Sequence, residues 1–501
     1  MTLAPAAVAA PHPAAVAAAE SAWREGGNAL DLALAAAAAL VVTYPHQCAL
    51  GGDLIALVRD PSRGIRAVVS AGAAPRAIDV EALRAAGERM PPGGPHSVTV
   101  PGVLAGWEAL AGQGAAHPLA GHLRRAADLA ADGAPVAAGL ARAILARREA
   151  VAADPGLSAL LMPDGEPLRE GTTLRQPRLA ATLRAIADGG PGVFYGGPVG
   201  EALVAGLQRL GGRHDLDDLY AHAAELAEPL SALVDGARWS VAPPPSQGAT
   251  LLGLLRTLAR AETRLRAVRS LATARDALLG DPRRAPIDID GLLAGATPEA
   301  VAGPPRVTGD TVAVATADGE GRAVILIQSV YQTFGAGILE PETGIVLHNR
   351  GSAFSLVAGH PAEIGGGVRP PHTLCPAIVE TAGGAIVAVG CQGGRAQPQV
   401  LAQVAGAAAA DDSDLEAALA RPRWIVGARD VDRGRETVLA EPGAAAPEAE
   451  AAAAGIPVDR LPGPADVAGH VQVARIASDA LAAASDPRSD GRAVVLRGGD
   501  A

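Results

Sequence analysis

The residues with the clearest chemical potential in this sequence are Asp310 and Thr311, which follow a run rich in glycine and proline from Gly295 to Gly309. If the chain were cut between them, Thr311 would carry a free α-amine beside its own hydroxyl. An α-amine with an ordinary pKa near ~8 can accept the hydroxyl proton, so one residue would supply both nucleophile and general base. Threonine is also common at the start of a strand, and on this stretch alone that structural role is the simpler interpretation.

The residues after Thr311 predict a β-hairpin. Apolar and β-branched residues run from 312 to 317 and again from 323 to 331, and the polar stretch from Asp318 to Gly321 separates them as a turn. Thr311 would then lie where a pliable loop meets a strand. Earlier in the chain the pattern predicts a strand over 6–10, helices over 14–25 and 28–42, and further helices between 251 and 279.

Composition and charge limit the class of protein. The chain has 501 residues, 49% hydrophobic and 19% charged, which is long enough for two ordinary domains or one large assembly. A net charge of −11, without long arginine blocks or aromatic stacking platforms, makes nucleic acid an unfavourable partner. Cys48, Cys375 and Cys391 are too few and too scattered for a disulfide framework or a zinc site, so the sequence implies no metal and no cofactor.

Targeting and membrane signals are also weak. The first 19 residues are apolar but lack a basic region and are interrupted by prolines, and the longest apolar run, from Leu32 to Val42, is too short to span a bilayer. We expect a soluble, cytoplasmic protein that makes no membrane contact.

A series of motifs gives these residues a context. In chain order they are Gly26 to Asp31, Leu50 to Asp53, Val100-Pro101-Gly102, Phe194 to Gly197, Pro243 to Gly248, Gly309-Asp310-Thr311, Asn349-Arg350-Gly351, Gly393 to Gln399, Gly469 to Gln472 and Ser485 to Gly491. Together they resemble the γ-glutamyltransferase family, particularly its intracellular branch, over residues 5 to 495. The alanine-, glutamate- and proline-rich tract from Glu441 to Gly455 is predicted to be a low-complexity insert on the surface.

The resemblance implies an α+β fold of the N-terminal-nucleophile hydrolase type, a four-layer αββα sandwich. It places an autocatalytic cleavage site between Asp310 and Thr311. The products would be a large fragment, 1–310, and a small fragment, 311–501, which stay associated as one domain.

The resemblance also assigns roles at the site. Thr311 would be the nucleophile, and Gly393 and Gly394 would form the oxyanion hole, where unobstructed backbone N–H groups must point at the substrate. Ser329 takes the position of a hydroxyl that orients the nucleophile, although a structural serine in the core is an equally good interpretation. Strand alternation places Ser329 on the same face as Tyr331.

The departures from the family pattern concern the substrate. Members that take γ-glutamyl groups hold the α-carboxylate with an arginine, where this chain has Ala71, and the α-amine with an acid, where it has Ala353. An alanine can make neither contact, so the glutamyl clamp is missing at both ends.

Four other pocket positions are also changed, and we expect them to bind substrate: Tyr331, Arg350, His372 and Thr373. Arg350 could bind a carboxylate with two hydrogen bonds, although a structural arginine remains the alternative. His348 and His372 are expected to serve as hydrogen-bond partners, not catalysts, because an N-terminal nucleophile already has its base.

The first hypothesis for function is an acyl hydrolase or acyltransferase acting on a small amide or oxo-acid through an acyl-enzyme on Thr311. Three alternatives stay open: hydrolysis of a C–C bond next to a ketone in a secondary-metabolite pathway, true γ-glutamyl transfer or glutathione hydrolysis, and an unprocessed relative without enzymatic activity.

Overall fold

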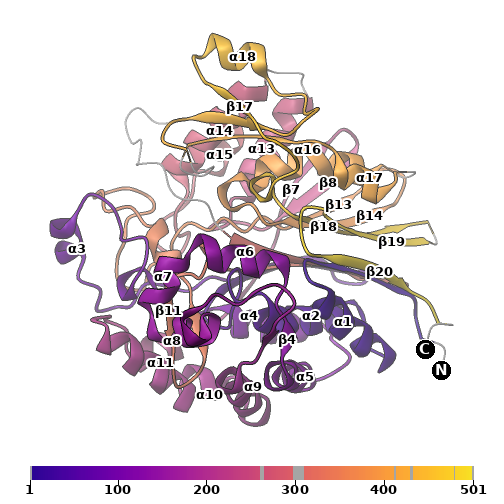
Figure 1. Ribbon diagram of the computed structural model, residues 1–501. Coiled ribbons are helices and arrows are strands. Elements are labelled where there is room, and N and C mark those ends of the chain that lie inside the picture. Colours follow the sequence, from indigo (N-terminus) through magenta and orange to yellow (C-terminus); the bar gives the residue numbers. More distant parts are fainter. Residues whose placement is uncertain are drawn as a thin grey trace.

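The computed structural model describes residues 3–259, 264–296, 310–410, 413–428, 433–478 and 480–498. Two β-sheets pack against each other at its centre, and helices lie on their outer sides (Figure 1). Most of the predicted linker from Gly295 to Gly309 lies outside the described residues, whereas Asp310 and Thr311 lie within them.

Both sheets are antiparallel between neighbouring strands. The first has the order β20 (Arg492–Leu496), β1 (Ala6–Ala10), β9 (Asp310–Asp318), β10 (Ala323–Tyr331), β2 (Asp53–Asp60), β3 (Gly64–Ser70) and β6 (Glu225–Ala227). The second has the order β19 (Ala480–Ser485), β18 (Val471–Ala477), β14 (Ile386–Cys391), β13 (Ala377–Glu380), β8 (Ala237–Val241) and β7 (Leu230–Val234). Since β1 pairs with β20, the two ends of the chain lie close together (Figure 1).

The predicted hairpin is confirmed as β9 and β10, which lie at the centre of the first sheet. The two strands are almost entirely buried, and alternate residues enter two different cores. Val312 and Leu326 pack with helix α2 (Ala29–Thr43), whereas Ala313 and Ile327 face the core between the sheets. Burial on both faces explains why the strands consist of continuous apolar residues and do not alternate with polar ones.

Helix α2 supports this hairpin from outside. Its N-terminus is fixed by a reciprocal cap in which the Asn28 side chain accepts from the N–H of Leu30 at 2.9 Å and Asp31 accepts from the N–H of Asn28 at 3.0 Å. All fifteen residues of α2 are buried, and its many alanines allow the strands and neighbouring helices to approach closely. The second sheet is covered by α13 (Gly248–Ala259) and α16 (Gln397–Ala409).

The remaining helices and strands surround these layers. The helices are α1 (Pro13–Arg24), α3 (Val80–Ala86), α4 (Val103–Ala111), α5 (Leu119–Asp132), α6 (Ala138–Ala146), α7 (Arg148–Ala153), α8 (Pro155–Leu161), α9 (Pro177–Gly189), α10 (Gly192–Tyr195), α11 (Pro198–Arg209), α12 (Leu216–Tyr220), α14 (Arg264–Leu278), α15 (Ile289–Ala294), α17 (Leu415–Ala420) and α18 (Glu448–Ala453). The strands are β4 (Ala134–Pro135), β5 (Thr173–Leu174), β11 (Ile338–Glu340), β12 (Ile345–Leu347), β15 (Trp424–Gly427), β16 (Thr437–Ala440) and β17 (Val458–Arg460).

The tract from Glu441 to Gly455 is not simply a surface insert, and that prediction was wrong for its buried members. Glu441 is 1% exposed, and its carboxylate accepts from the Arg488 guanidinium and from the N–H of Arg423 at 2.9 Å. Ala451 of α18 is completely buried. Two buried arginines lie near Glu441 and need an acidic partner. Alanine is small enough for α18 to pack closely against its neighbours. The biased composition of this tract is therefore compatible with a packed structure.

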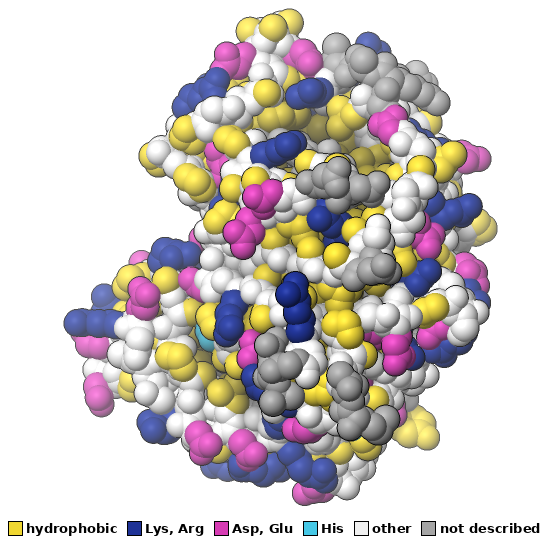
Figure 2. All heavy atoms as spheres, turned by 90° about the vertical axis from the view of Figure 1, so that its right-hand side faces the viewer, with side chains coloured by type: hydrophobic (Ala, Val, Ile, Leu, Met, Phe, Trp, Pro, Cys, Tyr) yellow, Lys and Arg dark blue, Asp and Glu magenta, His cyan; other side chains and the backbone are white. Residues whose placement is uncertain are grey.

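No helix in the described part of the chain has the length and hydropathy needed to cross a bilayer. On the face drawn in Figure 2, basic and acidic side chains are interspersed over the surface.

Candidate active site

Thr311, Ser329 and the Asp310 carbonyl form a continuous hydrogen-bonded chain. Thr311 is the second residue of β9 and is buried, and its Oγ1 donates to Ser329 Oγ at 3.2 Å. Ser329 Oγ in turn donates to the carbonyl oxygen of Asp310 at 2.5 Å and accepts from the N–H of Tyr331 at 2.8 Å. The Ser329 hydroxyl thus uses its single donor and both acceptor sites, which fixes its orientation between the predicted nucleophile and the predicted scissile carbonyl.

A bulge at the end of β10 makes this arrangement possible. The pairing register with β9 shifts between Gln328 and Tyr331, and Tyr331 has a φ of +77°. This conformation is uncommon for a residue other than glycine, and it turns the N–H of Tyr331 toward Ser329 Oγ. Strand alternation therefore does not apply across the bulge, and the face of Tyr331 is set by this kink.

Gly393 and Gly394, the residues predicted to form the oxyanion hole, lie in a turn that favours glycine. Their φ values are +143° and +51°, which favour glycine, and they lie between β14 and α16. Neither backbone N–H makes a hydrogen bond within the described residues. Gln247 fixes the turn because its Nε2 donates to the carbonyl oxygens of Gly394 at 2.9 Å and Thr373 at 2.7 Å.

One small pocket contains all four residues predicted to bind substrate: Tyr331, Arg350, His372 and Thr373. Ala353, the predicted departure from the glutamyl clamp, also lines it. Tyr331 ends β10, Arg350 and Ala353 share a short 3₁₀ turn, and the other two precede β13. The structure therefore brings together side chains from three separate segments.

Arg350 places a buried positive charge in this pocket. Its guanidinium is 1% exposed, stacks on the Tyr331 ring at 3.6 Å, and donates to Thr373 Oγ1 at 2.9 Å and the carbonyl oxygen of Pro371 at 3.4 Å. Burial lowers the pKa of Arg350 to about 10, so it stays charged at neutral pH. Among the described residues no carboxylate forms an ion pair with it, although the charge of Asp53 acts on it from beyond ion-pair distance. A buried cation without a direct ion pair is costly.

His372 is held by a buried carboxylate that sequence analysis did not single out. Its Nε2 lies 3.1 Å from Asp53 Oδ2, and His348 Nδ1 lies 3.4 Å from the same oxygen. Burial and the charge of Arg350 lower the pKa of His372 to about 4, so the ring is neutral at pH 7. Burial opposes ionisation of Asp53, but the two imidazoles outweigh it and leave the Asp53 pKa well below its usual range.

His372 forms a hydrogen bond with Asp53, and His348 Nε2 lies 2.9 Å from the carbonyl oxygen of Thr99, so each ring has a hydrogen-bond partner. The described residues contain no cluster of His, Cys, Asp and Glu side chains arranged to hold a metal ion.

Comparison with known proteins identifies the family. The γ-glutamyltranspeptidase family model matches residues 15–496. This chain belongs to the γ-glutamyltranspeptidase family. The match confirms the resemblance found in the sequence motifs, since γ-glutamyltransferase is another name for the same family.

Relatives within the γ-glutamyltranspeptidase family are hydrolases and acylases made as proenzymes. Oxamate amidohydrolase proenzyme of Klebsiella pneumoniae is 37% identical, over 97% of each chain. Glutathione hydrolase-like YwrD proenzyme of Bacillus subtilis is 32% identical, over 84% of this chain and 85% of the relative. The crystal structure of cephalosporin acylase from Bacillus halodurans superposes with a TM-score of 0.86 at 29% identity, covering 99% of this chain and 96% of that one. This chain therefore has the mixed α/β fold of that family.

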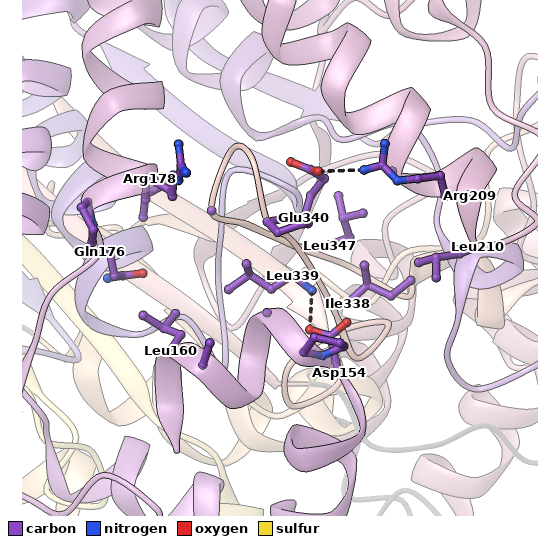
Figure 3. Close-up of a pocket in the computed structure, with 18 of the residues that line it drawn as sticks. Asp154, Leu160, Gln176, Arg178, Arg209, Leu210, Ile338, Leu339, Glu340 and Leu347 are labelled. Atoms are coloured by element: carbon purple, nitrogen blue, oxygen red, sulfur yellow. Dashed lines mark hydrogen bonds and ion pairs between the residues drawn. The ribbon is translucent and has the colours of Figure 1, made fainter. Parts of the chain in front are cut away.

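A larger cavity of about 510 Å³ contains none of the predicted site residues (Figure 3). It lies between α8, α9, α11 and the segment from β11 to β12, and Leu160, Leu339 and Leu347 give it an apolar lining. Three of its charged groups already have partners: Arg209 lies 3.5 Å from Glu340, and Asp154 accepts from the N–H of Leu339 at 3.3 Å. In this member of the γ-glutamyltranspeptidase family, we therefore place the candidate active site at Thr311 and the smaller pocket.

Asp53 and Gln247 are supporting residues that sequence analysis did not single out. Both lie inside motifs that it recognised, Leu50 to Asp53 and Pro243 to Gly248. The available signal was an acid or an amide next to a glycine or proline turn. It did not identify their partners, which are up to 319 residues away in sequence.

Proposed function

We propose that this chain is a proenzyme that cleaves its own Asp310–Thr311 bond and then hydrolyses a small amide bearing a carboxylate, through an acyl-enzyme on Thr311. One observation supports this most directly: the Ser329 hydroxyl links the Thr311 hydroxyl to the carbonyl oxygen of Asp310. A threonine that only began a strand would have no need of such a link to the preceding carbonyl.

Self-cleavage would begin when Thr311 Oγ1 attacks the carbonyl carbon of Asp310. The C–N bond breaks, the hydroxyl proton passes to the departing nitrogen, and an ester replaces the amide. Water then adds to the ester, which releases the Asp310 carboxylate and regenerates the Thr311 hydroxyl with a free α-amine. Ser329 donates to the oxygen on which negative charge develops, and removing one such donor in comparable enzymes costs about 10²–10³ in rate.

In the mature enzyme the Thr311 amine would take the hydroxyl proton as Oγ1 attacks the substrate carbonyl. The free N–H groups of Gly393 and Gly394 would bind the resulting oxyanion. Collapse releases ammonia or an amine and leaves an acyl ester on Thr311. Water, deprotonated by the same amine, then hydrolyses that ester and frees the acid.

The carboxylate of the substrate would pair with Arg350. Its buried guanidinium lines the pocket without an acidic partner among the described residues, and its planar fork suits a carboxylate. The relative named oxamate amidohydrolase is consistent with this class, because oxamate is a small amide that carries a carboxylate. Ala353 offers no acid for an α-ammonium, and Asp276, which also lines this pocket, is already paired with Arg275 and Arg395. Both features argue against a γ-glutamyl substrate.

The two fragments would stay together because their strands are interleaved. In the first sheet β1 of fragment 1–310 lies between β20 and β9 of fragment 311–501, and β10 pairs with β2. In the second sheet β13 pairs with β8 across the same division. We infer that the two sheets and their outer helices form the four-layer αββα sandwich of N-terminal-nucleophile hydrolases, shared by a heterodimer.

Gel electrophoresis of the purified protein followed by an ammonia-release assay tests this proposal. We expect fragments 1–310 and 311–501 from the wild type and a single full-length band from Thr311→Ala. Thr316→Ala is the matched control, since Thr316 is another buried threonine on β9 and donates to the Ala29 carbonyl oxygen at 2.7 Å. An intact wild-type chain after prolonged incubation, or cleavage that persists in Thr311→Ala, would refute the proposal.

A further inference from the structure

The Asp310 side chain is held as specifically as its carbonyl oxygen. Thr333 Oγ1 donates to Asp310 Oδ2, and Gln392 Nε2 donates to Oδ1 at 3.3 Å. These donors come from different sheets, because Thr333 follows β10 and Gln392 follows β14 of the other sheet. Neither contact is needed to form the strand, since Asp310 already pairs with Tyr331 through the backbone.

Both donors lie in segments with little freedom to move. Thr333 precedes Phe334, which has a φ of +62° and whose N–H donates to the carbonyl oxygen of His46 at 2.9 Å. Gln392 is buried, and its N–H donates to the carbonyl oxygen of His470 at 3.0 Å. Its Oε1 is also buried and has no hydrogen-bond partner in the described residues. The buried amide of Gln392 thus donates to Asp310 while its oxygen has no partner among the described residues. A buried acceptor without a partner lowers stability, so packing alone does not explain this arrangement.

We propose that Thr333 and Gln392 form a cradle for the Asp310 side chain, which makes Asp310 a positioning residue for self-cleavage. This inference rests on the proposed function. With the carbonyl oxygen held by Ser329 and the side chain held by the cradle, the Asp310 carbonyl group is fixed at two points. The carbonyl carbon is then presented to Thr311 Oγ1 in one orientation, which removes the entropy cost of finding it.

The cradle favours an ionised Asp310, because both of its contacts are donors. Burial raises the pKa of Asp310, although the bonds from Thr333 and Gln392 oppose this shift. The titratable groups that also act on Asp310 are His470, which lowers its pKa, and Asp466, which raises it; the two side chains lie 3.2 Å apart. A proton on Asp310 would take up one acceptor site and weaken the cradle. Self-cleavage should therefore slow as pH falls through the raised pKa of Asp310.

The rate of self-cleavage in freshly purified full-length protein, followed on gels, tests the cradle. We expect Asp310→Ala and Gln392→Leu to slow cleavage at least tenfold. Asp310→Asn should cleave at the slower rate that the wild type shows below the pKa of Asp310, because its amide, like a protonated carboxyl, has one acceptor oxygen for two donors. Its rate should not slow further in acid. Gln399→Leu is the control, since Gln399 follows on α16 and bonds the carbonyl oxygen of Val426 at 2.9 Å, outside the cradle.

The outcomes separate this inference from the proposed function. If the wild type does not cleave, the proposed function fails. If the wild type cleaves and Asp310→Ala matches its rate, the cradle has no role. An identical pH profile in wild type and Asp310→Asn would likewise overturn the inference. Once cleaved, Asp310→Asn should show wild-type kcat/KM per cleaved molecule, because a positioning residue for maturation does not serve the mature reaction.

If Asp310→Ala has a lower melting temperature than the wild type, the cleavage rate of Gln392→Leu alone tests the cradle. Wild-type cleavage in a stable Gln392→Leu protein would overturn the cradle.

Discussion

Replacing Arg350 with methionine should remove the preference for an anionic amide. Arg350 is 1% exposed, so the charge pair that it would form with a substrate carboxylate is shielded from solvent. Removing one partner of a buried, hydrogen-bonded charge pair typically costs about 2–5 kcal/mol. With about 1.4 kcal/mol for each factor of ten, kcat/KM for an anionic amide should fall roughly 30- to 4,000-fold.

The assay compares oxamate with oxamide, its neutral diamide, by release of ammonia from the cleaved enzyme. Arg350→Met should lower kcat/KM for oxamate much more than for oxamide. For oxamate, kcat/KM of Arg350→Lys should lie between the values of the wild type and Arg350→Met. Lysine keeps the charge but loses the planar fork and the stacking on Tyr331.

The stability of Arg350→Met separates this role from a structural one. The substitution leaves Thr373 Oγ1 and the Pro371 carbonyl oxygen without a donor, which costs about 1 kcal/mol for each bond. It also removes a buried charge that has no acidic partner in the described structure, which offsets that loss. We expect a melting temperature close to that of the wild type and normal self-cleavage. Equal losses toward both amides, or no loss at all, would refute the assignment of Arg350 to the substrate carboxylate.

Three further predictions follow from the site and the core. Ser329→Ala should slow self-cleavage by about 10²–10³, measured on gels, since Ser329 donates to the scissile carbonyl; cleavage at the normal rate would exclude that role. Ala71→Arg combined with Ala353→Asp should raise hydrolysis of a γ-glutamyl anilide, and a folded, cleaved double variant without any gain would mean that the missing clamp does not set specificity. Stability should fall as pH drops from about 6.5 toward 4: burial lowers the pKa of His12, His214, His222 and His372 to about 4, so the unfolded chain binds those protons first. A melting temperature that does not change over this interval would contradict the last prediction.

The hairpin and the pocket residues could be predicted from sequence for two different reasons. The hairpin has local signals: apolar runs of strand length around a polar turn, which depend on residues close together in the chain. Periodicity could not predict that one pocket contains Tyr331, Arg350, His372 and Thr373. Their segments are brought together only when the sheets fold. The resemblance of whole motifs to one family supplied that information.

Supporting contacts were beyond sequence reasoning because they are set by packing. Asp53 joins His348 and His372 across about 300 positions, and nothing local distinguishes it from a turn aspartate after two glycines. The bulge that turns the N–H of Tyr331 toward Ser329 is equally invisible, since a strand pattern predicts uninterrupted alternation. The composition of the tract from Glu441 to Gly455 predicted a surface insert, which was wrong for its buried members. Composition alone does not show that Glu441 is the partner of Arg488.

In the proposed function, the position of Ser329 would link maturation to catalysis. In the uncleaved chain its one proton is committed to the Asp310 carbonyl oxygen, and its lone pairs take the Thr311 hydroxyl and the Tyr331 N–H. Cleavage followed by departure of Asp310 would free that proton while the other two contacts persist, because Thr311 and Tyr331 belong to the two neighbouring strands β9 and β10 of the same hairpin. The same hydroxyl could then donate to the new Thr311 amine when that amine is neutral, which is the form that acts as a base. A single serine would thus serve both reactions, and the bulge at Tyr331 is the feature that holds it in place for each.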